Sequence, residues 1–210
     1  MKSGKFIVLE GLDGSGKTKA AKYIKKILKK KGIMKIKNVH EPGSTLIAEK
    51  IRKIIKKNQN KEKIYYKTEI LLMYAARIQL INNIIKPSLK KGKWIIGDRH
   101  NLSTLAYQGG KNGIHQNFIL KLKKKFFKKF EPNLTIFLDV KPKIGIKRFL
   151  KRNKIDRIES KKKNFFLEVR NNYFKIIKLF KNIIIIDANK NIKNVQKNIK
   201  KNIYKWLNTI

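Results

Sequence analysis

The residues of this chain that most plainly could carry chemistry stand together near its start. A glycine-rich segment fills the pattern G-x-x-x-x-G-K-T directly after an apolar run at residues 6–9, and it comprises Gly11, Leu12, Asp13, Gly14, Ser15, Gly16, Lys17 and Thr18. Such a loop turns consecutive backbone N–H groups into a concavity for phosphates, its lysine reaches the outer phosphates, and its threonine hydroxyl can ligate Mg²⁺. The spacing predicts binding of a nucleoside triphosphate, and an ordinary glycine-rich turn is the alternative.

Carboxylates stand directly after each apolar run that could form a strand. They are Glu10, Glu41, Asp98, Asp139 and Asp187. Because ligands bind at the carboxyl ends of parallel strands, these side chains are candidates for chemistry. Asp98 could orient a Mg²⁺ shell beside the glycine-rich loop, and the adjacent Arg99 could bridge phosphate oxygens. A surface Asp–Arg pair that ends a strand is the alternative.

A basic segment at about residues 147–160 is predicted to form a lid. It contains three arginines, Arg148, Arg152 and Arg157, around a break at Asn153-Lys154. A segment of this kind could close over the site, bringing positive charge to a phosphoryl group in transfer and excluding water. The solvated end of a basic helix is the alternative.

These side chains need a scaffold that brings them together. Short apolar runs predict strands at residues 6–9, 33–40, 94–97, 134–138 and 183–186. Amphipathic stretches predict helices at residues 17–31, 46–57, 65–89, 115–129, 143–151, 164–180 and 191–207. Apolar strands joined through helices are typical of a parallel sheet covered on both faces. The 210 residues are therefore predicted to form one α/β domain, residues 1–210, with a three-layer P-loop NTPase fold, a five-stranded parallel sheet and a short lid.

The charge of the chain is strongly positive. Lys and Arg number 54 against 13 Asp and Glu, for a formal net charge of +41. In isolation this balance suggests a nucleic-acid partner. The excess is mostly lysine spread along the chain together with abundant asparagine and isoleucine, which also fits a bias toward A/T-rich codons acting on solvated faces. We therefore predict that nucleic acid is not required, with a selected basic surface as the alternative.

Composition also excludes several classes of site. The chain has no cysteine, which excludes disulfides, thiol catalysis and cysteine-ligated zinc, and its three histidines lack metal-ligand spacing. It contains no apolar run of about eighteen residues and no secretory signal. The sequence predicts a cytoplasmic protein without a membrane span.

Six motifs occur in an order and spacing that resemble those of thymidylate kinases. They are EGLDGSGKT at residues 10–18, HEPGST at 40–45, YAAR at 74–77, DRH at 98–100, AYQGG at 106–110 and DRIE at 156–159. The resemblance covers essentially the whole chain. It implies transfer of the γ-phosphoryl group of ATP to dTMP, which gives dTDP, with Mg²⁺ as the cofactor.

The resemblance implies a role for each matched position at the phosphates. The loop at residues 11–18 holds ATP, with Lys17 on the transferred group. Thr18 and Asp98 hold the metal. Arg99 and Arg52 neutralise the acceptor phosphate, which has to approach another anion.

A glycine in the phosphate loop bears on the role that the resemblance gives the lid arginines. Gly14 occupies the position at which some members of the family carry an arginine. Members without a basic residue there use the lid instead, so the resemblance gives Arg148, Arg152 and Arg157 a catalytic role. The family also forms homodimers through helices packed side by side, which we carry over as an expectation.

The resemblance also implies an acceptor site. Arg77 donates to a thymine carbonyl, Tyr107 packs where a ribose 2′-hydroxyl would lie, and Asp13 lies near the sugar and acceptor phosphate. The whole expected dTMP site consists of Glu10, Asp13, Glu41, Pro42, Arg52, Met73, Arg77, Arg99, Thr104, Tyr107 and Gln108.

Three positions depart from the family pattern. His40 replaces an arginine, Ser44 replaces a glycine, and Met73 stands where a phenylalanine usually stacks on thymine. A thioether can cover an aromatic face with less defined geometry. Two other functions therefore stay open: a P-loop kinase acting on a nucleoside or another monophosphate, and a nucleic-acid-binding P-loop protein.

Overall fold

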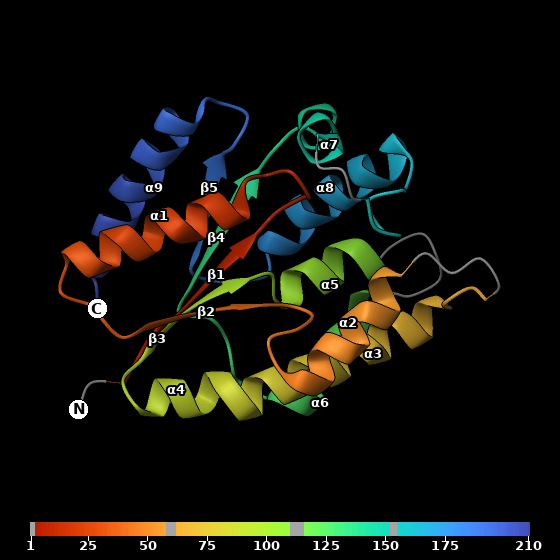
Figure 1. Cartoon of the computed structure of the whole chain (residues 1–210), viewed down its shortest axis with the longest axis horizontal. Coiled ribbons are helices and arrows are strands. Elements are labelled where there is room, and N and C mark those ends of the chain that lie inside the picture. Colours follow the sequence, from red (N-terminus) through yellow and green to blue (C-terminus); the bar gives the residue numbers. More distant parts are fainter. Residues whose placement is uncertain (1–2, 58–61, 110–115, 152–154) are drawn as a thin grey trace.

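The computed structural model describes residues 3–57, 62–109, 116–151 and 155–210 (Figure 1). Its strands are β1 (Phe6–Glu10), β2 (Ile36–His40), β3 (Trp94–Asp98), β4 (Leu134–Asp139) and β5 (Ile183–Asp187). They form a five-stranded sheet in the order β2-β3-β1-β4-β5, and every neighbouring pair is parallel. The predicted five-stranded parallel sheet is confirmed.

The central strands are apolar runs because both of their faces are covered. All residues of β1 are buried, and every residue of β4 except Asp139 is buried. A strand covered on both faces needs apolar side chains on both, not an alternation. The edge strand β2 begins later than the predicted residue 33, because the N–H of Ile33 still bonds back to Leu28 O of the preceding helix at 3.0 Å.

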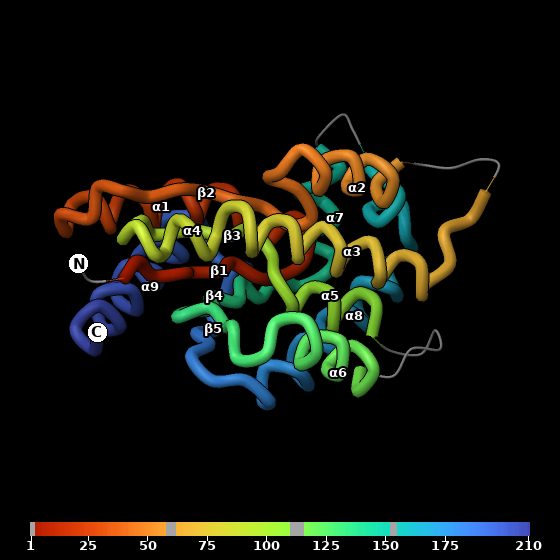
Figure 2. Tube along the Cα trace, turned by 90° about the horizontal axis from the view of Figure 1, so that it is seen from below, coloured from red at the N-terminus to blue at the C-terminus, as the bar shows by residue number. Residues whose placement is uncertain are grey.

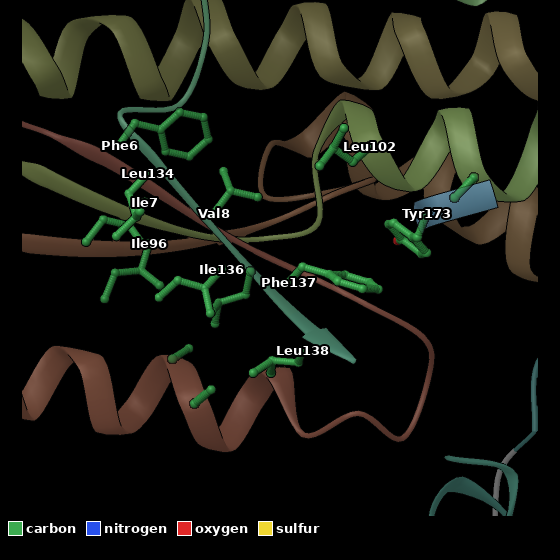
Figure 3. Packing of buried hydrophobic residues seen from close by; sticks show 14 of the residues in the cluster. Phe6, Ile7, Val8, Ile96, Leu102, Leu134, Ile136, Phe137, Leu138 and Tyr173 are labelled. Atoms are coloured by element: carbon green, nitrogen blue, oxygen red, sulfur yellow. The ribbon is translucent and has the colours of Figure 1, made fainter. Parts of the chain in front are cut away.

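Nine helices are found in the described part of the chain. They are α1 (Lys17–Lys30), α2 (Leu46–Lys56), α3 (Tyr66–Leu80), α4 (Lys86–Lys90), α5 (Asn101–Gln108), α6 (Gln116–Phe127), α7 (Pro142–Leu150), α8 (Lys163–Ile177) and α9 (Ile192–Leu207). Helices α1 and α9 pack on one face of the sheet, and α3, α4, α5 and α8 lie on the other (Figures 1 and 3). Among these residues no helix has the length and apolar content to cross a membrane.

The core is divided by the sheet into two layers (Figure 3). Phe6 and Val8 of β1 point toward the α3–α4 side, and Ile136 and Leu138 of β4 point toward α1. The side chains alternate because successive residues of a strand face opposite sides of the sheet.

One long rod of helix crosses the α3 face, with α2 beside its α3 end (Figure 2). The predicted helix at residues 65–89 corresponds to this rod, in which a π-helical segment, η1 (Ile81–Ile85), joins α3 to α4. Pro87 follows within one turn and has no N–H to bond the carbonyl of Asn83. The π-helical turn therefore lies where the regular series of α-helical hydrogen bonds is interrupted.

Helix α5 is absent from the predicted helices. Seven of its eight residues are buried. A helix without an exposed polar stripe gives no amphipathic period, so pattern analysis does not detect it. It carries much of the site described below.

Candidate active site

The carboxyl ends of the strands open into a cavity of about 720 Å³. Its walls come from the loop between β1 and α1, the ends of β2 and β3, helices α2, α3, α5 and α7, and the segment from β5 into α9. The predicted site residues that line it are Asp13, Gly14, Ser15, Gly16, Lys17, Thr18, Glu41, Pro42, Arg52, Met73, Arg77, Asp98, Arg99, Thr104, Tyr107, Gln108 and Arg148. The fold thus brings most of the predicted site into one space.

The phosphate loop has the backbone that its glycines permit. Gly11, Gly14 and Gly16 have φ angles of 136°, 76° and 94°, all in a region that disfavours other residues. Lys17 is 7% exposed, and its Nζ donates to Gly11 O at 3.1 Å and Leu12 O at 2.9 Å. Burial, reinforced by the nearby Arg99, lowers the pKa of Lys17. The ammonium is held at the loop rather than in solvent.

Helix α7 touches the phosphate loop through backbone. A Cβ added to Gly14 would lie 2.2 Å from Gly145 O, and one added to Gly145 would lie 2.8 Å from Asp13 O. An arginine at position 14 is therefore incompatible with this packing. Arg148, one turn further along α7, donates to Ala188 O at 2.9 Å and reaches Gly14 O at 3.5 Å.

Asp98 and Thr18 are the oxygen ligands that the site offers a metal. Both line the cavity, and neither the carboxylate nor the hydroxyl has a hydrogen-bond partner among the described residues. A carboxylate with a hydroxyl is a donor set that suits Mg²⁺, which keeps several waters and takes further oxygens from phosphates. The residues present therefore fit this ion. No group of three or more metal-binding His, Cys, Asp or Glu residues occurs in the described ranges.

Arg99 joins the strand end to the loop. Its φ of 71° is left-handed, which costs about 1–2 kcal/mol for a side chain with a Cβ. Its guanidinium donates to Asp13 at 2.6 Å, Ser103 Oγ at 3.0 Å and Gly11 O at 3.1 Å. Burial alone would raise the pKa of Asp13, but Arg99 and Lys17 outweigh it and hold that pKa below its usual range. Tyr107 also donates to Asp13, at 3.0 Å.

Arg77 lines the cavity from helix α3 and is fixed by residues of α5 and of the segment after β2. It is 2% exposed, and it donates to Glu41 Oε2 at 2.6 Å, Thr104 Oγ1 at 2.8 Å and Asn101 Oδ1 at 3.3 Å. Burial would raise the pKa of Glu41, but the adjacent His100, 2.6 Å away, and Arg77 lower it to about 2. The result is a buried, ionised cluster that fixes the guanidinium plane.

The other residues predicted for the acceptor site have partners of their own or line the cavity wall. Gln108 Nε2 donates to Glu69 Oε1 at 2.7 Å, and Arg52 donates to Pro42 O at 2.8 Å. Met73 is partly buried in the wall of the same cavity. These groups leave an end of the cavity that is polar on the α5 side and has a thioether in its wall.

Glu10 lies beneath the cavity rather than in its wall. It is fully buried, its Oε1 accepts from the N–H groups of His100 and Ser103 at 2.8 and 3.2 Å, and its Oε2 accepts from Ser103 Oγ at 2.5 Å and Tyr173 at 3.0 Å. Burial raises its pKa despite these bonds. All of its contacts are with protein, so Glu10 positions the start of α5. Gly11 and Leu12 are likewise not part of the cavity wall. Their carbonyls accept from Lys17, and that of Gly11 also accepts from Arg99.

The lid arginines take different positions. Arg152 and the expected break at Asn153-Lys154 lie outside the described residues. Arg157 is not in the cavity wall; it donates to Ile55 O at 2.8 Å and pairs with Glu69. The neighbouring Asp156 pairs with Lys56 at 2.5 Å. These contacts tie the end of the lid to the end of α2.

Two of the departures from the family pattern form one small cluster. His40 Nε2 pairs with Glu49 at 2.7 Å, and Ser44 Oγ lies 3.2 Å from His40 Nδ1. Ser44 has a φ of 69°, a backbone conformation that favours the glycine of the family pattern. The Ser44 N–H is held by the same carboxylate of Glu49 at 2.6 Å.

Several functional residues were not found by sequence reasoning. Ser103 and Tyr173 support Arg99 and Glu10, and Glu69 holds Gln108. Glu69 could have been singled out from the sequence, because only 13 Asp and Glu residues occur in the chain and this one lies in an apolar helix. Ser103 and Tyr173 have no comparable signal.

Known proteins resemble this chain over nearly its full length. The sequence profile of the family described as Thymidylate kinase matches residues 9–199. A thymidylate kinase of Buchnera aphidicola subsp. Schizaphis graminum is 56% identical over 207 residues, which cover 99% of this chain and 98% of that protein. Those of the subspecies Acyrthosiphon pisum and Baizongia pistaciae are 53% identical over 208 residues and 49% identical over 209, with coverage of 98% or more of both chains.

Proposed function

This chain belongs to the thymidylate kinase family, and on that premise we propose how its site carries out the reaction ATP + dTMP → ADP + dTDP. The observation that carries the assignment of roles is the single cavity that joins the phosphate loop to the Arg77 end. A donor triphosphate on the loop and an acceptor nucleotide against Arg77 would place their reacting phosphates between them. Asp98 and Arg99 line the same cavity. Arg99 contacts Asp13 of the loop, and the adjacent His100 contacts Glu41, which is the partner of Arg77.

The donor side uses the loop of residues 11–18. Its amides would hold the ATP phosphates, and Lys17 would neutralise charge on the transferred group. Thr18 and Asp98 would hold Mg²⁺, and the ion would supply positive charge that offsets the charge of the phosphates. The unpartnered carboxylate and hydroxyl described above support this assignment.

The acceptor phosphate would lie against Arg99 and Arg52. Both guanidiniums line the cavity, and a guanidinium binds phosphate oxygens through two parallel N–H donors. Arg99 already has a carboxylate partner in Asp13, so it reaches the phosphate with its orientation set. This preorganisation lowers the cost of bringing two anions together.

The nucleoside of dTMP would occupy the far end. Arg77, Thr104 and Gln108 would contact the base edge, and Met73 would cover its ring. Tyr107 and Asp13, joined by a hydrogen bond, would line the sugar. Glu41 would act by holding Arg77, and Pro42 by holding Arg52 through its carbonyl.

The lid is part of the same proposal. Arg148 would supply positive charge at the phosphate loop, where Gly14 has no side chain to do so. Arg152 keeps the catalytic role that the resemblance implies. Arg157 would hold the lid down on α2 and α3, as its contacts with Ile55 and Glu69 support.

We also propose a homodimer that acts in the cytoplasm as one domain, residues 1–210, without need of nucleic acid. Helices α2 and α3 leave large apolar side chains exposed, namely Leu46, Ile47, Ile54 and Leu71. Such side chains are suited to a second copy packed against these helices. Sedimentation velocity of the parent and of Leu46→Lys tests this, and a concentration-independent monomer would contradict it.

The assay for the proposed function is the ADP yield with each candidate monophosphate in turn. We expect dTMP to be the best acceptor and Lys17→Ala to lose at least about a hundredfold in turnover with its fold intact. Turnover within threefold of the parent would reject the role of Lys17. A salt titration of DNA binding beside the assay separates the kinase from a nucleic-acid-binding protein.

A further inference from the structure

Two polar side chains offer hydrogen-bonding groups at the end of the cavity that is proposed to take the acceptor base. Arg77 and Gln108 both line this end. Arg77 can only donate, and of its five N–H donors three are used by Glu41, Asn101 and Thr104. Two donors are left without a partner among the described residues, so Arg77 offers the cavity N–H groups and no acceptor.

Gln108 differs, because an amide carries both an acceptor and donors. Its Nε2 donates to Glu69 Oε1 at 2.7 Å. An ionised carboxylate can only accept, so the amide must turn its NH₂ group toward Glu69. The amide oxygen accepts no hydrogen bond from the rest of the described chain, and it is the group left to face a ligand.

Glu69 is itself held in place from the other side. It is 5% exposed, and its second oxygen pairs with Arg157 of the lid. Arg157 is anchored in turn on Ile55 O at 2.8 Å. A carboxylate fixed between an arginine and an amide cannot rotate away without leaving a buried charge unpaired, which is costly.

We propose that Glu69 is a positioning residue that selects the acceptor base through Gln108. It fixes the Gln108 amide so that the cavity presents a donor from Arg77 beside an acceptor from Gln108. This pair complements a pyrimidine with a carbonyl at C4 and an N–H at N3, and it opposes one with an amino group at C4 and a bare N3. The inference rests on the proposed function, in which this end of the cavity takes the base.

Glu69→Gln tests the proposal, because a glutamine at this position can donate or accept and no longer dictates the orientation of Gln108. The measured quantity is the ratio of kcat/KM for dTMP to that for dCMP. We expect this ratio to fall by about tenfold or more, since unpaired buried polar groups are what reject the wrong base. In a Gln108→Leu background, Glu69→Gln should change the ratio by less than about twofold, because its effect passes through Gln108.

Arg157→Gln is the matched control. It removes the other partner of Glu69 and keeps the carboxylate that accepts from Gln108. We therefore expect lower turnover and a change in the dTMP-to-dCMP ratio that is much smaller than the change caused by Glu69→Gln. Should Glu69→Gln fold poorly because Arg157 loses its partner, the double variant Glu69→Gln/Arg157→Gln leaves a neutral amide pair and should show the same fall in the ratio.

A folded Glu69→Gln that phosphorylates dTMP with the ratio of the parent would overturn the inference. The same holds if Glu69→Gln shifts the ratio equally with and without Gln108. A parent protein that phosphorylates no dTMP at all would instead reject the proposed function on which the inference rests.

Discussion

Met73 stands in the proposed acceptor site where the family pattern has a phenylalanine. Its side chain lies in the wall of the cavity on α3, one turn before Arg77. Base–aromatic stacking contributes about 1–3 kcal/mol per base, and sulfur–aromatic contacts about 0.3–1.5 kcal/mol. A thioether at this position should therefore weaken base binding without abolishing it.

We expect Met73→Phe to tighten dTMP binding by up to about tenfold. The affinity for an ATP analogue should hardly change, because the proposed function places Met73 against the acceptor base. Isothermal titration of parent and variant with each ligand measures both. A changed affinity for the analogue with unchanged dTMP affinity would mean that residue 73 serves the other nucleotide, and weaker dTMP binding would mean that the ring overpacks the wall.

Glu41 gives a prediction for stability against pH. Its pKa is about 2 in the folded protein and near 4.5 when unpaired. Because the folded-state pKa is the lower, the stabilisation is present above pH 4.5 and is lost as the pH falls toward 2. The shift corresponds to about 3 kcal/mol.

Urea unfolding of the parent and Glu41→Gln at pH steps from neutral down to about 3 tests this expectation. The variant should be less stable than the parent at neutral pH, and the difference should shrink as the pH drops through the acid range. A difference that does not depend on pH would show that the loss comes from packing rather than from the charge of Glu41.

At the scale of elements, the contact between the phosphate loop and α7 depends on the absence of two side chains. Gly14 and Gly32 have similar left-handed φ angles, 76° and 80°, but a Cβ on Gly32 would meet nothing within 4 Å. Alanine at either position carries the same backbone strain of about 1–2 kcal/mol. Only at Gly14 does it also push against the backbone of Gly145.

Gly14→Ala should therefore lower ATP affinity and stability well beyond the matched control Gly32→Ala. Gly32→Ala should lose only the stability that corresponds to the backbone strain, and it should keep its nucleotide affinity. Thermal melts with and without ATP measure both effects. Equal losses in the two variants would mean that the approach of α7 to the loop has no part in holding the nucleotide.

The elements differ in how well the sequence predicts them. Strands β1, β3 and β4 follow from apolar runs that end in a carboxylate, because full burial leaves a continuous apolar run in the sequence. Helix α5 does not follow, because it is buried nearly all round. Motif spacing predicts Arg77 and Gln108, but not Glu69, whose role depends on three elements meeting in space.

The whole molecule has a formal net charge of +41 on 210 residues, and these like charges repel one another in the compact state. We expect the melting temperature to rise as NaCl increases from about 0.05 M to about 0.5 M, because the screening length falls well below 10 Å. Each kcal/mol gained raises Tm by about 2–4 °C in a chain of this size. Chloride is used rather than sulfate, which strengthens apolar burial by exclusion. Calorimetry that shows a flat or falling Tm would mean that the charges are already neutralised by bound anions.

The edge position of β5 gives this charge a second consequence. Within the described residues β5 pairs only with β4, and its run of isoleucines includes Ile185, which is 50% exposed. An apolar edge strand is a template on which another chain can add a strand and start an aggregate. Lys181 and Lys190 flank the run, and like charges on two approaching copies oppose such pairing. Salt screens these charges and so removes this protection. Added salt should therefore raise the melting temperature of the folded chain and at the same time promote aggregation at high protein concentration.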